Sequence, residues 1–215
     1  MIREMVISIR EAVKANCYLP ALALALALPD ILGQEMYPDL QHSNGRRDIS
    51  EQYKTWFNEW VMKSHYYLGD DSSDTFSLKL ISENNSNRDK SQHYYFDGAM
   101  CYRLRCSFLH SGNYAFDLPK SDGYNYQHIK FELRINASDS TGISWKDEDY
   151  EDREAHVTID IGTLCNSICD GVDHCLRDNP SIIEGNDIKI IDLKTWKTDS
   201  PVKVEGSWIK ARRIE

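Results

Sequence analysis

The sequence lacks an apolar run long enough to cross a bilayer. Its longest such run, "YLPALALALALP" from Tyr18 to Pro29, is shorter than the about 20 apolar residues that a membrane-spanning helix needs. The segment before it is amphipathic and contains acidic residues, unlike the short basic start of a secretory leader. We therefore expect a soluble, cytoplasmic protein with no membrane partner.

Basic residues are scarce: 25 Lys and Arg stand against 34 Asp and Glu, for a net charge of -9. Affinity for nucleic acid comes mainly from accumulated Lys and Arg, so this balance argues against a broad nucleic-acid-binding surface. Any RNA contact needs a local basic pocket. The 215 residues, 41% of them hydrophobic, suffice for one folded domain with its own core.

Familiar catalytic motifs are also missing. The sequence has no Gly-rich phosphate loop, nucleophile elbow or HExxH motif. Cys165, Cys169, His174 and Cys175 are zinc-ligand residue types, but these thiols fall on the apolar stripe of a predicted helix, where cysteine packs as a small hydrophobe. We expect no metal, no cofactor and six reduced cysteines: Cys17, Cys101, Cys106, Cys165, Cys169 and Cys175.

Apolar periodicity predicts a mainly α protein in its first third. Residues 2–14 repeat apolar side chains at spacings of three and four, which is typical of an amphipathic helix. The Leu/Ala run that follows predicts a helix that is buried on all sides and ends or kinks at Pro29, with 30–48 as a connection. A further helix begins at Asp48, and its apolar stripe is Tyr53, Trp56, Phe57, Trp60 and Val61.

Later helices are predicted over 96–111 and 164–176. The first buries Met100, Leu104 and Phe108 and has Gly112 in the place of a C-terminal cap. The second is ended by Asn179-Pro180. The polar segment 69–93, rich in Asp, Ser and Asn, predicts a loop with a short apolar island around 78–81.

Period-two alternation predicts strands in the second half. In "YQHIKFELRIN" Ile129, Phe131, Leu133 and Ile135 face inward, and "AHVTIDI" at 155–161 forms a second strand. The acidic "SWKDEDYEDRE" between them reads as a solvated hairpin loop, while 188–196 and 202–208 read as a C-terminal hairpin pair. We predict a single α+β domain over 1–215, with an antiparallel β insertion within 119–161 and C-terminal strands within 185–210.

One helical segment hints at chemistry: "CYRLRCSFLHSGN" at 101–113 contains Arg103, Arg105 and His110. Arg105 and His110 form the pattern R-x4-H, and Arg103 with His110 forms R-x6-H. The pattern is loose, because Arg88 and His93 also fit it inside the polar loop. The helical context separates the two matches, since a helix with one buried face holds its side chains in place.

The segment "YRLRCSFLHSG", together with the upstream "ALALPDILG", resembles the HEPN family, and in particular an uncharacterised bacterial branch of it. HEPN proteins are small helical bundles whose catalytic members are metal-independent ribonucleases with an R-x4-6-H motif. The resemblance covers 1–118 and the helix 162–178 and leaves the strands outside it. The family usually has a polar residue after the motif arginine, whereas this chain has Cys106.

The resemblance implies that Arg105 and His110 are catalytic. On an α-helix, five residues turn the chain by about 500°, so these two side chains point about 140° apart. Arg103, Cys106 and Ser107 share a face with His110, which makes Arg103 and Ser107 candidate substrate-binding residues. The family forms its site by dimerisation, so we expect a homodimer that binds RNA in a local pocket at the dimer interface.

In such a site histidine takes a proton from the ribose 2′-hydroxyl and arginine holds the scissile phosphate. The enzyme hypothesis is thus an endoribonuclease acting as a toxin or defence effector, with an antitoxin or regulatory partner. The alternative is a HEPN-like dimerisation or partner-binding module without catalysis. In that case His110 caps its helix, favoured there by the dipole, and the arginines are surface or interface residues.

Overall fold

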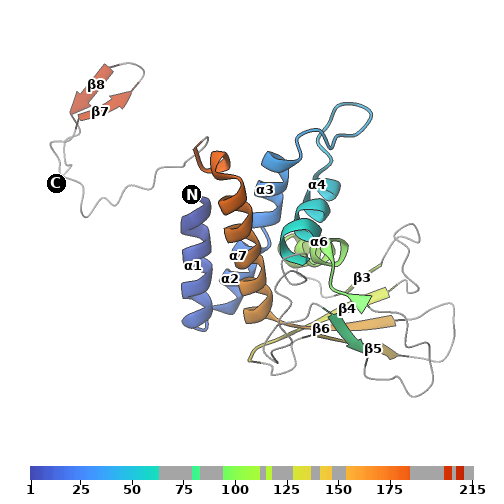
Figure 1. The fold of residues 1–215 in the computed structure, drawn as a ribbon. Helices are drawn as coiled ribbons and strands as arrows, with labels where there is room; N and C mark the ends of the chain where they lie inside the picture. Colours follow the sequence, from blue (N-terminus) through green and yellow to red (C-terminus); the bar gives the residue numbers. More distant parts are fainter. Residues whose placement is uncertain are drawn as a thin grey trace.

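The computed structural model describes residues 1–62, 79–82, 94–111, 115–117, 128–136, 141–146, 154–184, 201–204 and 207–210. In this part of the chain the protein is mainly helical. The helices lie side by side, and β3, β4, β5 and β6 lie at one end of them (Figure 1). This confirms the mainly α character that the sequence predicts.

The first three helices are α1 (Ile2–Lys14), α2 (Tyr18–Ala25) and α3 (Leu28–Met36). Val6 and Ile9 of α1 are buried, as the periodicity predicts. The interruption predicted at Pro29 lies just before it, because α2 ends at Ala25 and α3 begins at Leu28 with Pro29 in its first turn. The predicted connection over 30–48 is wrong for residues 30–36, which are helical. The first turn of a helix tolerates proline, since its backbone N–H groups have no partner within the helix.

Together α2 and α3 form an apolar helical segment, Tyr18–Met36, of 19 residues. By length and composition alone this segment could cross a membrane, contrary to the expectation from the shorter run Tyr18–Pro29, although buried core helices pass the same test. Six of its apolar side chains pack into the protein core: Ala21, Leu22, Ala25, Leu26, Leu28 and Leu32. Leu19 is 59% exposed, so the prediction of a helix buried on all sides is wrong for the first turn of α2.

Helix α4 (Ile49–Trp56) continues into a π-helical segment, η1 (Phe57–Met62). The Asp48 side chain accepts a hydrogen bond from the Glu51 backbone N–H at 3.1 Å, which confirms the predicted N-cap. The predicted apolar stripe is also confirmed. Trp60 is only half-buried, and the other four residues of the stripe are fully buried: Tyr53, Trp56, Phe57 and Val61.

Glycines from three other helices lie against the backbone of α4 and η1. A Cβ added at Gly33 would lie 2.7 Å from the Gln52 carbonyl oxygen, and one added at Gly98 would lie 2.5 Å from that of Lys54. A Cβ added at Gly171 would lie 3.0 Å from the Trp60 carbonyl oxygen. The continuous helix formed by α4 and η1 is therefore the central element, and α3, α6 and α7 pack against it.

We expect Gly98→Ala to lower the free energy of unfolding by about 1–3 kcal/mol, because the new methyl group must displace helix backbone. The matched control is Gly162→Ala, whose Cβ would meet nothing closer than the Asp160 carboxylate at 3.3 Å. That variant should be neutral or slightly stabilising, since alanine favours the helix over glycine. Urea denaturation measures both, and equal stability of the two variants would contradict the close approach at Gly98.

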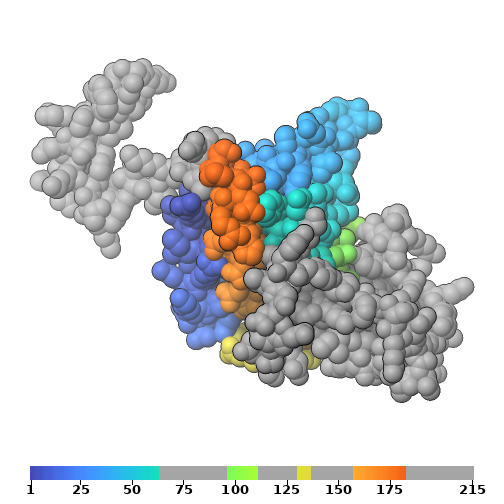
Figure 2. Space-filling view, viewed as in Figure 1, coloured from blue at the N-terminus to red at the C-terminus, as the bar shows by residue number. Residues whose placement is uncertain are grey.

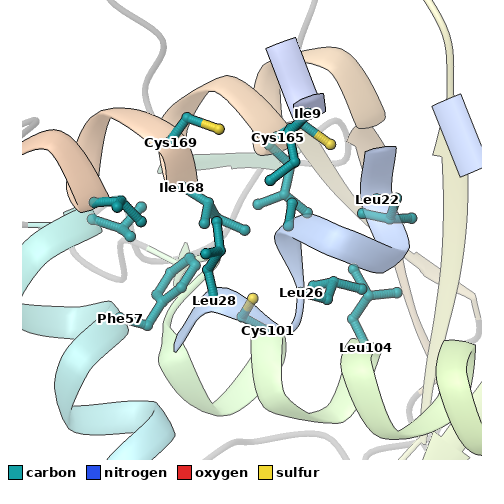
Figure 3. Packing of buried hydrophobic residues seen from close by; sticks show 14 of the residues in the cluster. Ile9, Leu22, Leu26, Leu28, Phe57, Cys101, Leu104, Cys165, Ile168 and Cys169 are labelled. Carbon is teal, nitrogen blue, oxygen red and sulfur yellow. The ribbon is translucent and has the colours of Figure 1, made fainter. Parts of the chain in front are cut away.

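Two later helices complete the bundle. Helix α6 (Gly98–Cys106) runs into a π-helical turn, η2 (Ser107–Ser111), and α7 (Ile161–Asp178) is followed by the 3-10 turn η4 (Pro180–Glu184). The predicted helices over 96–111 and 164–176 are thus confirmed, whereas Gly112 lies outside the described residues. In Figure 3, thiols of α6 and α7 lie among apolar side chains of α1, α2 and η1.

The described strands of the sheet run in the order β2-β1-β5-β6-β4-β3. Their bounds are β1 Lys79–Ser82, β2 Tyr94–Tyr95, β3 Ala115–Asp117, β4 His128–Arg134, β5 Thr141–Lys146 and β6 Glu154–Asp160. The predicted antiparallel insertion is wrong in its pairing: β4 and β6 are parallel neighbours over their whole length. The antiparallel partner of β6 is β5, which contains the residues 144–146 that the sequence assigned to an acidic loop.

The sheet also exceeds the predicted insertion at 119–161, since β1, β2 and β3 precede it in sequence. Phe131, Val157 and Ile159 are buried as predicted, but Ile135 is 51% exposed. The reason is that β4 ends at Arg134 and Asn136 turns the chain with a φ of 56°. Ile135 therefore lies beyond the paired part of the strand.

The C-terminal strands β7 (Pro201–Val204) and β8 (Ser207–Lys210) pair with each other in antiparallel orientation. The sequence predicts 202–208 as one strand of a pair with 188–196. Instead 202–204 and 207–208 belong to two different strands that pair with each other, and 188–196 lies outside the described residues.

Candidate functional site

The helix that contains the candidate motif, α6–η2, is fixed at its start. The Asp97 carboxylate accepts from the Met100 backbone N–H at 2.9 Å, and the Gly98 backbone N–H donates to the Asn58 side chain at 2.7 Å. Met100, Cys101 and Leu104 are buried. The cap, the contact with η1 and this buried face together set the rotation of the helix, and with it the direction of the motif side chains.

Arg105 forms an ion pair with α3. Its Nη2 donates to Oδ2 of Asp30 at 2.7 Å, and the two side chains are 16% and 21% exposed. Its Nε is buried and makes no hydrogen bond. The guanidinium also lies 6.0 Å from the Tyr53 ring centre and 5.8 Å from that of Tyr102, within cation–π range. Arg105 is therefore held in one orientation by a carboxylate and two aromatic rings.

Asp30 binds a second guanidinium as well. Its other carboxylate oxygen, Oδ1, accepts from Arg47 Nη2 at 2.5 Å, and the same nitrogen donates to the Asp30 backbone carbonyl at 2.7 Å. Arg47 Nε donates to the Gln52 side chain, and Gln52 in turn donates to the Tyr37 carbonyl at 2.8 Å. One carboxylate thus joins arginines from α6 and from the connection before α4.

The two tyrosines beside Arg105 are neutral donors. Burial raises the pKa of Tyr53 well above its usual range, and its hydroxyl donates to the Leu26 carbonyl at 3.2 Å. Burial also raises the pKa of Tyr102, with the Cys106 thiol adding to the effect and Arg105 opposing it. Neither phenol is therefore poised to act as a base at neutral pH.

His110 is not brought to Arg105 within one chain. It lies in η2 and is exposed, and among the described residues it makes no hydrogen bond or ion pair. The predicted 140° separation assumed an α-helix throughout. Because π-helical hydrogen bonds run from residue i to i+5, residues five apart lie closer to one face than an α-helix allows. The π-helical turn η2 thus reduces the angle between the Arg105 and His110 side chains. Even so, Arg105 contacts Asp30 whereas His110 faces solvent.

The two candidate substrate-binding residues differ in exposure. Arg103 is half-buried and forms no ion pair within the described residues. Ser107 is buried at 7% exposure and has a partner, so it does not share the exposed face of His110 as the helical spacing predicted. The change to π-helical geometry at Ser107 is the physical reason, since it breaks the α-helical register on which that prediction rested.

Sequence reasoning missed Asp30, Arg47 and Gln52, which complete the surroundings of Arg105. All three fall in or next to the segment 30–48 that was read as a connection. Gln52 offered a signal, because it is a polar residue beside the predicted apolar stripe and is only 1% exposed. Asp30 and Arg47 gave no such signal, since their contact joins residues far apart in sequence.

The cysteines occupy the positions that the apolar pattern predicts, with exceptions at Cys17 and Cys106. Cys17 is exposed and Cys106 is half-buried. The other four are buried, and all six are free thiols. Burial raises the pKa of Cys165 and Cys169 to about 12 and that of Cys175 to about 11. Within the described residues no group of three potential ligands is close enough to hold a metal ion.

We expect a thiol reagent at pH 8 to modify Cys17 quickly and the buried thiols slowly in the folded protein, and all six cysteines in urea.

Above pH 9 the thiols of the unfolded chain lose protons while the buried thiols of the folded protein keep theirs. The free energy of unfolding therefore falls as the pH rises, by up to about 1.4 kcal/mol per pH unit for each thiol. Thiol titration and urea denaturation at pH 8 to 10 measure this. Rapid modification of all six thiols without denaturant would contradict the packing.

A groove of about 390 Å³ lies on the surface between α1 and α7. In Figure 2 these helices, blue and orange, are neighbours on the visible face. Arg10 crosses between them and pairs with Asp170 at 2.7 Å and Asp173 at 2.8 Å. Arg3 and Arg177 also line the groove, so its arginines outnumber its one acidic lining residue, Asp173, and the groove carries an excess of positive charge. None of the motif residues lines it.

Comparisons with protein-family models, with curated proteins and with solved structures give no match for this chain. The geometry around α6–η2 and the motif itself are therefore the evidence from which a function can be inferred.

Proposed function

We propose that the protein is a metal-independent endoribonuclease of HEPN type that acts as a homodimer in the cytoplasm. The observation that carries the proposal is the arrangement on one helix: Arg105 is held in a fixed orientation by Asp30, and the uncommitted His110 is exposed on the following π-helical turn. π-helical turns inside α-helices are frequent at functional sites.

The chemistry divides between the two residues. The exposed imidazole of His110 accepts the proton of a ribose 2′-hydroxyl, and the alkoxide attacks the neighbouring phosphorus. The P–O5′ bond breaks and gives a 2′,3′-cyclic phosphate and a 5′-hydroxyl, whose oxygen takes up a proton from the protonated imidazole or from water. The Arg105 guanidinium stabilises the charge that builds on the phosphate oxygens. Because the two side chains diverge within one chain, the site takes its arginine from one protomer and its histidine from the other.

The test uses single-stranded RNA in EDTA, with light scattering in parallel. We expect cleavage without added metal, cyclic phosphate ends, and a mass near twice the 24.9 kDa of the chain. Activity that EDTA abolishes would remove the proposed mechanism. A strictly monomeric protein would remove the composite site.

A second candidate is a non-catalytic dimerisation or partner-binding module. One observation favours it: the charge of Arg105 is already neutralised by Asp30, as in a structural ion pair that joins α3 to α6. On this reading wild-type protein leaves varied RNAs intact, while substitutions at His110 weaken binding to an antitoxin or other regulatory partner.

A further inference from the structure

The carboxylate of Asp30 is shared between two arginines. Oδ1 binds Arg47 at 2.5 Å and Oδ2 binds Arg105 at 2.7 Å, so the three side chains carry one positive charge in excess. They are partly buried, with exposed fractions of 29% for Arg47, 16% for Arg105 and 21% for Asp30. Charge in such surroundings is screened less than on an open surface.

The geometry points to Arg47 and Arg105 as a two-guanidinium subsite for an RNA phosphate, oriented by Asp30. This inference rests on the proposed function and deepens it, because it adds Arg47 as a phosphate-binding residue and Asp30 as a positioning residue. Guanidinium groups bind phosphate oxygens through paired N–H donors, and two of them fixed by one carboxylate present donors with little loss of side-chain freedom on binding.

The hydrogen bonds leave donors for such a ligand. Arg47 uses Nε on Gln52 and Nη2 on Asp30, and Arg105 uses only Nη2, on Asp30. Neither Nη1 takes part in a hydrogen bond within the described residues. The net positive charge and the spare donors of the pair match the charge and acceptor oxygens of a phosphodiester.

The test measures binding of a fluorescein-labelled 2′-O-methyl RNA of mixed sequence, which lacks the attacking hydroxyl and cannot be cut. The dissociation constant is determined at several salt concentrations. For single strands, the slope of log K against log salt changes by about 0.7 for each phosphate contact. We expect Arg47→Gln to flatten the slope by about 0.7 and to weaken binding about tenfold, which corresponds to one charge-assisted hydrogen bond.

Asp30→Asn raises the local charge by one and should steepen the slope by about 0.7. The matched control is Arg134→Gln, an arginine on β4 that is 46% exposed and lies outside the subsite, and it should change neither slope nor affinity. Circular dichroism verifies that each variant folds. If Arg47→Gln does not fold, Arg47→Lys replaces it: the charge is kept, so the slope is unchanged, while loss of the guanidinium fork weakens binding about tenfold.

Folded Arg47 variants that bind the 2′-O-methyl RNA like wild type overturn the inference, as does wild-type protein that does not bind it. The proposed function fails separately. If wild type binds this RNA through Arg47 but never cuts natural RNA, the subsite stands and the ribonuclease proposal falls. If wild type cuts RNA and Arg47→Gln binds normally, the ribonuclease stands and the subsite falls.

Discussion

Replacing His110 with alanine should lower the rate of RNA cleavage in EDTA by about 10²–10⁴-fold, the usual contribution of a general acid or base. The fold should not change, because the side chain is exposed and makes no hydrogen bond or ion pair in the described residues. The measurement is the single-turnover rate on a fluorescent RNA, together with the thermal unfolding midpoint. An inactive variant with an unchanged midpoint supports the proposed role.

The motif supplies matched controls. Arg105→Ala should lose activity like His110→Ala, whereas Arg103→Ala should be milder. Arg88 and His93 repeat the R-x4-H spacing elsewhere in the sequence, and their alanine variants should cut at the wild-type rate. If Arg103→Ala proves more harmful than Arg105→Ala, the x6 spacing is the functional one.

Mixing the two inactive proteins tests the composite site. A heterodimer of Arg105→Ala and His110→Ala keeps one intact pair when arginine and histidine come from different chains. It keeps none when both come from the same chain. We therefore expect partial recovery of activity on mixing, and no recovery would show that one protomer holds the complete site.

Replacing Asp30 with alanine should lower the free energy of unfolding by about 2–4 kcal/mol. The substitution leaves the partly buried guanidinium groups of Arg47 and Arg105 without their carboxylate, and hydrogen bonds to charged groups are worth about 1.5–3 kcal/mol each. Arg105→Ala should cost less, because Asp30 keeps its bonds to Arg47. Urea denaturation gives the three free energies, including that of the double variant.

The double variant should be less destabilised than the sum of the single variants by about 0.5–3 kcal/mol, since the two side chains are in direct contact. The surface control is Arg134→Ala, which removes an ion pair with Glu132 whose members are 46% and 57% exposed. Exposed pairs contribute at most about 1 kcal/mol. A strictly additive double variant would mean that Asp30 and Arg105 do not interact in solution.

The helices were predictable because the residues that form the buried face of each helix lie within a few turns of one another in the sequence. Val6 and Ile9, or Met100 and Leu104, are spaced so that one turn of helix brings them together, and the Asp48 cap needs only its own first turn. The end or kink predicted at Pro29 lies instead just before the proline, between Ala25 and Leu28. A proline in the interior of a helix ends or kinks it, whereas a proline in the first turn is compatible with the start of a helix. The local sequence around Pro29 is consistent with both positions.

Strand pairing was beyond local reasoning. The alternation in β4 and β6 identifies both strands, yet the same alternation fits a parallel or an antiparallel neighbour. Their pairing depends on where β5 lies, and β5 pairs with the far side of β6 instead of separating the two. Residues 144–146, at the start of the acidic segment, form part of β5 because hydrogen bonds to β6 hold them, and the local periodicity does not reveal this pairing.

The sequence by itself determined the helical core and the presence of an arginine and a histidine near the end of one helix, since both follow from residues within a few turns of each other. Only the tertiary structure decided what Arg105 faces. Its partner Asp30 is 75 residues away, and the π-helical geometry at Ser107–Ser111 departs from the α-helical register that the sequence pattern predicts. Contacts between distant segments depend on how whole helices pack, and that packing is a property of the complete chain.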